Sequence, residues 1–141
     1  MIHTLFGIVE CSIFMALSGL HFYWFFGGKW GLEEALPTNE KGVKVLNPGK
    51  IETAVVAFGL LAFGIFYLLE SGLISMELPK WVREYGGWFI VLIFIARTIG
   101  DFNYVGIFKR IKNTEFAKRD TKYYAPLCLF IALIGMLLEL N

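Results

Sequence analysis

Charged and aromatic residues interrupt the end of a long apolar run between Trp88 and Phe108. Arg97, Asp101, Tyr104 and Phe108 follow one another at intervals of four, three and four residues, so on a helix they share one face. Ionisable side chains inside a membrane are costly, and they usually face the interior of a bundle or a water-filled cavity. This stretch therefore indicates a buried polar site that can pair charges or bind a polar group. It does not specify a reaction.

The composition is that of an integral membrane protein. The chain has 141 residues, of which 57% are hydrophobic, 17% aromatic and only 18% charged, and this excludes an ordinary soluble domain. A helical span needs about 20 apolar residues, so a single domain over residues 1–141 has room for four. We predict an all-α, four-helix membrane bundle with spans at about 2–26, 53–69, 88–108 and 123–140. The expected partner is the lipid bilayer, and no nucleic acid is expected.

The segments around these spans also carry predictions. The first apolar segment lacks Lys and Arg before it and a small-residue cleavage site after it, so it is expected to be a retained span and not a signal peptide. Residues 43–46 could form a short strand or hairpin inside the polar loop 32–50. Residues 79–85 could form a short interfacial helix. Asp120 or Thr121 can cap the fourth helix.

The distribution of basic residues predicts the orientation of the spans. The first connector contains four lysines and the third contains six Lys or Arg residues, whereas the second contains only Lys80 and Arg83. Cytoplasmic loops are enriched in Lys and Arg. Both termini are therefore expected outside, with the first and third connectors in the cytoplasm. The expected location is the inner (cytoplasmic) membrane, crossed several times.

This orientation brings the polar residues of different spans to one leaflet. At about 1.5 Å of rise per residue, Asp101 lies roughly 6 Å nearer the cytoplasm than Arg97, at a depth comparable with that of His21. The long Arg97 side chain could also reach Glu10 beyond the membrane midpoint. We predict a network Glu10–Arg97–Asp101–His21 that opens to the cytoplasm. The full candidate binding site is His21, Tyr23, Trp24, Arg97, Asp101, Tyr104, Asp120, Tyr124 and Glu10.

Each of these residues also has a purely structural interpretation. Arg97 and Asp101 could neutralise each other and hold two helices in register. His21 could be an interfacial histidine with satisfied hydrogen bonds or, with a reference pKa near 6.5, a proton carrier. Asp120 could be a helix cap rather than an acid that takes part in chemistry. The remaining aromatic residues suit the interfacial belt and the core of a membrane protein.

No metal or cofactor is expected. The two histidines, His3 and His21, lie about 27 Å apart along one helix and cannot share a metal ion. Cys11 and Cys128 fall at different depths, which argues against a disulfide. Motifs for phosphate binding, for a nucleophile elbow and for paired cysteine ligands are missing. Catalysis therefore stays open, with no catalytic residue assigned.

Three ordered motifs resemble a known family. They are His21-x-Tyr23-Trp24-x-x-Gly27-Gly28-x-Trp30-Gly31, Arg97-x-x-Gly100-Asp101-Phe102-x-Tyr104-x-Gly106, and Asp120-Thr121-x-x-Tyr124-x-Pro126-Leu127-Cys128. The pattern is similar to that of small bacterial four-helix membrane proteins classified only as a domain of unknown function. The resemblance implies a four-span inner-membrane protein and groups these positions as a site. It implies no substrate, and Glu10 lies outside its motifs.

Three functions fit these observations. The first is a membrane-embedded site for a small or lipid-like molecule, which should have a cavity beside Arg97 and Asp101. The second is a small accessory subunit of a larger membrane complex, in which the same groups should be tightly packed. The third is a homodimeric proton-coupled exporter with Glu10 as the proton carrier.

Overall fold

The computed structural model describes all residues, 1–141, and the protein is all-helical without strands. Three helices are long and apolar enough to cross a membrane: Ile2–Phe25, Lys50–Glu70 and Glu115–Leu140. The first two are α1 and α3, and the third combines α5 (Glu115–Arg119), a π-helical turn η1 (Asp120–Tyr124) and α6 (Ala125–Leu140). The prediction of an all-α protein with several apolar helices is confirmed at this level.

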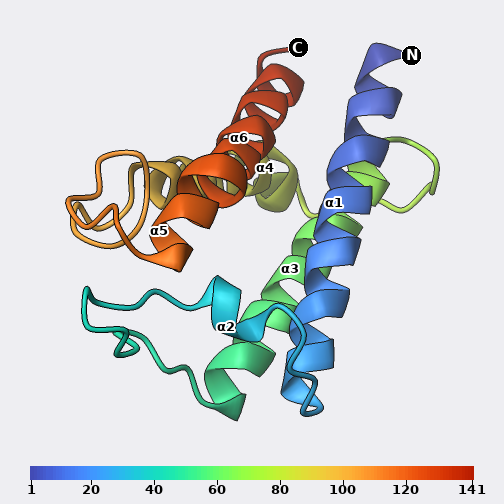
Figure 1. Cartoon of the computed structure of the whole chain (residues 1–141). Helices are drawn as coiled ribbons and strands as arrows, with labels where there is room; N and C mark the ends of the chain where they lie inside the picture. Colours follow the sequence, from blue (N-terminus) through green and yellow to red (C-terminus); the bar gives the residue numbers. More distant parts are fainter.

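The helices pack as two pairs. α1 lies beside α3 along most of its length, and α4 (Lys80–Ile99) packs against α6. Buried side chains from all four helices form one core, including Phe14 of α1, Tyr67 of α3, Phe94 of α4 and Ile131 of α6. Both termini lie at the same end of the molecule (Figure 1). The end of α1 and the start of α3 lie at the opposite end, α2 (Leu32–Ala35) lies toward that end, and α5 lies about midway.

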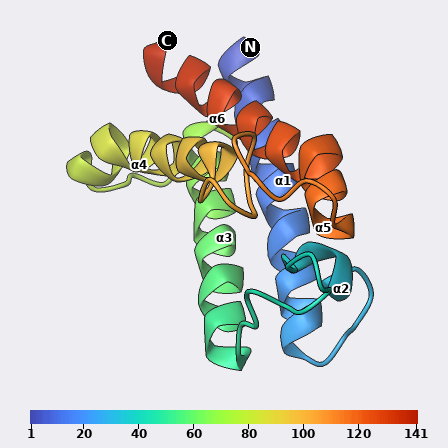
Figure 2. The same cartoon turned by 60° about the vertical axis from the view of Figure 1, so that its left-hand side comes forward.

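α4 differs from the predicted third span. It begins eight residues earlier than Trp88, at Lys80, and it ends at Ile99, so residues 100–108 lie outside the helix. The predicted interfacial helix at 79–85 is the first part of this same helix. Figure 2 shows α4 lying across the direction of α3 and not alongside it. Gly100 terminates the helix with φ +82°, a conformation that other residues rarely adopt.

The last helix begins earlier than predicted. The helical segment starts at Glu115, and Thr114 caps it by accepting a hydrogen bond from the backbone N–H of Ala117 at 3.0 Å. Asp120 is therefore inside the helical segment and does not cap it. Pro126 stands at the start of α6, where the preceding π turn accommodates its missing N–H.

The polar loop between α1 and α3 contains no strand. Of the expected strand or hairpin at 43–46, the structure has only a minimal hairpin-like pairing: Thr38 and Lys44 form one isolated antiparallel bridge, and the N–H of Val45 donates to the Pro37 carbonyl at 2.9 Å. The side chain of Asn39 closes this turn by accepting hydrogen bonds from the N–H groups of Lys41 and Val43. A side chain that satisfies the backbone locally in this way favours a turn over a sheet.

Candidate functional site

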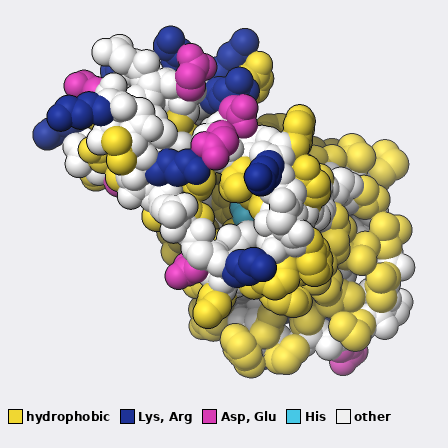
Figure 3. Space-filling model, turned by 60° about the horizontal axis from the view of Figure 1, so that its bottom comes forward, with side chains coloured by type: hydrophobic (Ala, Val, Ile, Leu, Met, Phe, Trp, Pro, Cys, Tyr) yellow, Lys and Arg dark blue, Asp and Glu magenta, His cyan; other side chains and the backbone are white.

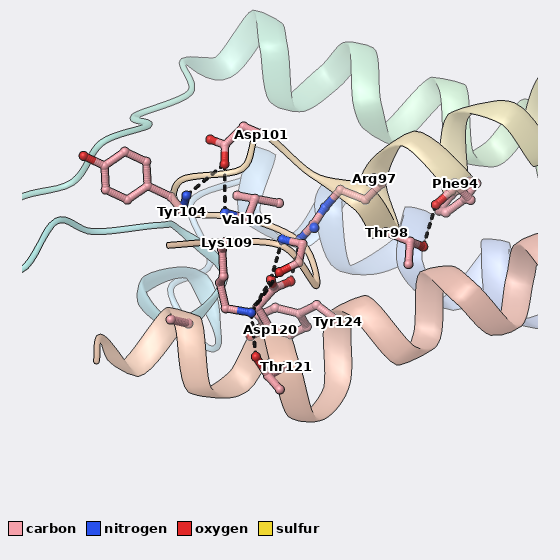
Figure 4. A network of polar contacts seen from close by, with 12 residues as sticks. Phe94, Arg97, Thr98, Asp101, Tyr104, Val105, Lys109, Asp120, Thr121 and Tyr124 are labelled. Atoms are coloured by element: carbon pink, nitrogen blue, oxygen red, sulfur yellow. Dashed lines mark hydrogen bonds and ion pairs between the residues drawn. The ribbon is translucent and has the colours of Figure 1, made fainter. Parts of the chain in front are cut away.

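A fully buried aspartate is the centre of the main polar cluster. Asp120 has no exposed surface and lies on the π turn, between α5 and α6. Its Oδ2 accepts a hydrogen bond from the backbone N–H of Gly106 at 2.7 Å and contacts Lys109 Nζ at 3.3 Å, while its Oδ1 contacts Arg97 NH2 at 3.2 Å. Figure 4 shows these groups converging from α4, the following loop and the π turn. One carboxylate thus joins three segments of the chain.

Lys109 is buried beside this carboxylate. Its ammonium group also donates to the carbonyl oxygen of Gly106 at 3.0 Å and to the hydroxyl of Thr121 at 2.5 Å. The three donors of the ammonium group are therefore all used. A buried lysine is tolerated only with such compensation, because removing an ion from water costs several kcal/mol.

Arg97 is less completely satisfied. Its side chain is 33% exposed, and it pairs with Asp120 through one terminal nitrogen. The other terminal nitrogen, NH1, is buried and has no hydrogen-bond partner. With both cations and the one carboxylate in their usual charge states, the cluster carries a net charge of +1.

Asp101 has a different role from the predicted one. It is not one helical turn from Arg97, because the helix ends before it, and it lies apart from the Asp120 cluster in Figure 4. Its Oδ1 accepts hydrogen bonds from the backbone N–H groups of Asn103, Tyr104 and Val105 at 2.8–3.0 Å. Slight burial raises the pKa of Asp101, but these backbone bonds lower it further, so the net pKa is lowered. Asp101 organises the loop.

Two glycines allow this loop to place Gly106 against Asp120. Gly100 has φ +82° and Gly106 has φ +90°. A Cβ on Gly100 would collide with the backbone carbonyl of Val105, and a Cβ on Gly106 with that of Ile99. The loop is closed by a hydrogen bond from the Ile107 N–H to the Thr98 carbonyl at 2.9 Å. The glycine spacing of the second motif therefore has a backbone explanation.

The residues at the end of α1 form a separate structure. Tyr23 and Trp24 hold the turn after the helix: Trp24 Nε1 donates to the Trp30 carbonyl at 2.8 Å, and the Tyr23 hydroxyl accepts from the Trp30 N–H at 3.4 Å. His21 donates from Nδ1 to the Leu17 carbonyl at 2.7 Å and packs edge-on against Trp24. No hydrogen bond or ion pair joins this turn to Arg97 or Asp101, so the predicted link from Asp101 to His21 is not formed.

Of the two predicted tyrosines, Tyr124 lies beside the Asp120 cluster and Tyr104 does not. Tyr124 lies beside Asp120 in Figure 4, and its hydroxyl donates to the Glu34 carbonyl at 3.0 Å, which ties the start of α6 to α2. The Tyr104 side chain points away from the Asp120 cluster. Of the predicted set, the structure thus brings together Arg97, Asp120 and Tyr124.

Glu10 is buried elsewhere in the protein. It has no exposed surface, and neither carboxylate oxygen has a hydrogen-bond partner. The predicted bridge from Arg97 to Glu10 is therefore not formed. The prediction relied on depth along the membrane, which does not determine the direction in which a side chain points.

Two depressions lie in the loop region, and one residue of the predicted site, Trp24, lines the smaller of them. An open depression of about 540 Å³ lies between the 38–42 turn and Asn113–Glu115, and a smaller one of about 130 Å³ lies between the end of α1 and the start of α3. Neither is lined by Arg97 or Asp101. No group of three or more His, Cys, Asp or Glu side chains is placed to hold a metal ion.

The geometry can now be compared with known proteins. Residues 14–135 match the family described as "Protein of unknown function (DUF3995)". The chain belongs to the DUF3995 family. The match extends from the middle of α1 to near the end of α6, so it includes the Asp120 cluster and the turn after α1. No curated protein and no solved structure matches the chain.

Sequence reasoning missed Lys109, Gly106 and Thr121 as members of the Asp120 cluster. Lys109 is one of six basic residues in a charged connector, and nothing in its neighbourhood marks it as buried. Gly106 was part of a motif, but its contribution is a backbone N–H, which every residue except proline has. Thr121 adjoins Asp120 in the third motif, and this adjacency was the one available signal.

Proposed function

We propose that this DUF3995 protein crosses the cytoplasmic membrane four times as a four-helix bundle, with both termini outside. The directions of the helices support an even number of crossings. α1 and α3 run in opposite directions, α6 runs in the same direction as α3, and the termini lie at one end. If these three helices cross the membrane, residues 71–114 must cross it as well, and α4 is the helix in that segment. Its 20 residues are about 30 Å long, enough for a span.

At the cytoplasmic end, the protein binds the anionic headgroup of a lipid or lipid-like molecule through Arg97. The observation that carries this proposal is the net positive cluster in which Arg97 NH1 is buried without an acceptor. A guanidinium group presents a planar fork that fits carboxylate and phosphate oxygens. An anion at Arg97 would supply the missing acceptor and neutralise the remaining charge.

The surroundings of Arg97 suit a lipid headgroup better than an enclosed small molecule. Neither described depression adjoins it, whereas charged side chains gather over the loops of the molecule in Figure 3. Exposed apolar side chains of the loop after α4 and of the π turn could enter the bilayer interface; they are Phe102, Ile107, Phe108 and Tyr123. Basic residues next to anionic lipid are attracted by about 1 kcal/mol each.

Native mass spectrometry of protein extracted gently from its own membrane tests this proposal. We expect a bound anionic lipid or lipid-like molecule in the wild type and its loss in Arg97→Ala. Arg97→Lys keeps a charge opposite Asp120 but removes the fork, so it should fold and retain less ligand. Arg83→Ala, an exposed arginine at the other end of α4, is the matched control and should retain the ligand. Equal retention by all four proteins would contradict the proposal.

A second candidate function is that of a small accessory subunit in a larger membrane complex. It is favoured by the Lys109–Asp120 pair, whose polar atoms are bonded within the chain in a tightly packed arrangement. Such a pair holds segments together without any ligand. The same mass spectra would then contain a larger polypeptide complex without a bound small molecule.

A further inference from the structure

A second buried polar group lies far from the Asp120 cluster, between α1 and α3. Glu10 is 0% exposed and Tyr67 is 1% exposed. Both Glu10 carboxyl oxygens and the Tyr67 hydroxyl lack any hydrogen-bond partner. Buried polar atoms are nearly always bonded, so three unpartnered ones belonging to two neighbouring residues require an explanation.

Glu10 and Tyr67 are packed among α1, α3 and α6. Glu10 lies on the buried face of α1, one turn before Phe14, and the Phe14 ring stacks on the Tyr67 ring at 5.8 Å with an angle of 3° between the planes. On the other side, the Tyr67 hydroxyl occupies space that a side chain at Gly135 of α6 would take, 2.9 Å from the position of its Cβ. Tyr67 thus lies between α1 and α6, with its hydroxyl against α6.

Further ionisable groups lead from this pair toward the end with the termini. Glu139 of α6 lies one helical turn beyond Gly135, the residue against which the Tyr67 hydroxyl packs, and Glu70 lies three residues beyond Tyr67 on α3. Glu139 packs over Gly87 of α4. His3 lies seven residues, about two helical turns, before Glu10 on α1.

Exposure increases along this series. Glu10 and Tyr67 are buried, Glu70 and Glu139 are half-buried, and His3 is exposed. The groups therefore form a graded route from the protein interior to water. This route is separate from the cytoplasmic end of the protein, where Arg97 and Asp120 lie.

We propose that Glu10 is a proton-binding site inside the membrane-spanning part of the protein, which exchanges its proton with water at the terminal end through Tyr67 and Glu139. An ionised carboxylate with no cation or donor beside it is too costly to bury, so the resting group is the neutral acid. On release, the Glu10 O–H bond breaks and a carboxylate remains. Because neither Glu10 nor the Tyr67 hydroxyl is hydrogen-bonded in the resting structure, the transfer requires these side chains to move within hydrogen-bond distance. The Tyr67 oxygen then takes that proton while its own passes to Glu139, so the phenol stays neutral. Glu139 then releases the proton to water, and His3 and Glu70 set the local charge.

Infrared difference spectroscopy of the reconstituted protein, recorded as the pH is stepped, tests the site. The wild type should show a carbonyl band of a protonated carboxyl that disappears on ionisation, and Glu10→Gln should lack this band. Glu52→Gln, which alters an exposed carboxyl at the far end of α3, is the matched control and should keep it. An identical band in the wild type and Glu10→Gln would overturn the proposal.

Two further experiments test the proton route through Tyr67 and Glu139, and the Glu10 site without the Glu10→Gln variant. After a rapid pH jump, the Glu10 band should change several-fold more slowly in Tyr67→Phe and in Glu139→Gln than in the wild type, and equal rates would overturn the route. A membrane-soluble carbodiimide, which reacts with protonated carboxyls in apolar surroundings, should label Glu10 in the unmutated protein. Failure to label it would count against the site even if Glu10→Gln does not fold.

Discussion

At the scale of single residues, Asp120 and Asp101 look equivalent in the sequence but have different structural roles. Asp120 is fully buried and opposes two cations, whereas Asp101 is exposed and binds only backbone N–H groups. A carboxylate that holds buried cations contributes to the stability of the whole fold. One that closes a turn contributes mainly to the order of that turn.

Asp120→Asn should destabilise the protein strongly. It leaves Lys109 buried and opposite a neutral group, and removing one partner of a buried ion pair costs about 3–5 kcal/mol. The midpoint of thermal unfolding in detergent would measure the loss. Glu115→Gln is the control, because this side chain is 79% exposed in its i,i+3 pair with Lys118. A change in Asp120→Asn no larger than that of the control would show that the cluster does not stabilise the fold.

Asp101 predicts a pH dependence. Its folded pKa lies below its ordinary value of 3.8, so ionised Asp101 stabilises the fold at neutral pH, and this contribution is lost as the pH falls through 3.8 toward the folded pKa. Asp101→Asn keeps an acceptor oxygen but cannot ionise. The wild type should therefore unfold at a higher temperature than Asp101→Asn at neutral pH, and the difference should shrink in acid. A difference that stays constant with pH would contradict this assignment.

At the scale of elements, the loop after α4 determines whether the buried cluster can form. Its conformation depends on two glycines with positive φ and close backbone contacts, and it places the Gly106 N–H against Asp120. The loop and the π turn are therefore parts of one unit. A change in the loop backbone should therefore weaken the hydrogen bond from the Gly106 N–H to Asp120.

Gly106→Ala should destabilise this unit beyond the cost of its φ angle. A residue other than glycine with φ near +90° costs of order 1–3 kcal/mol, and here the added Cβ would also meet the Ile99 carbonyl. Gly42→Ala is the matched control, since Gly42 has φ +78° but nothing within 4 Å of the added atom. Thermal unfolding should show a clearly larger loss for Gly106→Ala. Equal losses would mean that the close contact is relieved without cost.

At the scale of the whole molecule, the position of α4 determines the membrane topology. It is the helix that the four-span proposal needs, yet it carries Lys80, Arg83, Glu84 and Arg97, and it lies across α3. A tilted span and a helix lying at the interface predict different topologies. With four spans the termini are on the same side, as in Figure 1. With three spans and α4 at the interface they would be on opposite sides, and the last helix would have to run opposite to its direction in the structure.

Reporter fusions at the two termini distinguish these topologies. We expect both ends to be outside and a cysteine introduced as Lys112→Cys to be labelled only from the cytoplasm, because the segment around it is rich in basic residues. Ser75→Cys, an exposed position in the connector between α3 and α4, is the matched position for labelling from outside. Termini on opposite sides would refute the four-span arrangement.

The sequence by itself determined the class of protein, because apolar composition and the length of apolar runs depend on each residue separately. It also singled out Arg97 and Asp120, since charges next to apolar runs stand out without any structure, and it singled out Tyr124 through the third motif. It placed Arg97 and Asp101 on one helix face, but Gly100 ends the helix between them, and the carboxylate of Asp101 satisfies its own backbone instead.

Only the tertiary structure decided which charges meet. Asp120 pairs with Arg97 and Lys109, which are 23 and 11 residues away in the sequence, and a spacing rule for one helix cannot describe a contact made across a loop. The tertiary structure also separated Glu10 from Arg97, because the rotation of a helix about its axis follows from packing and not from depth in the membrane.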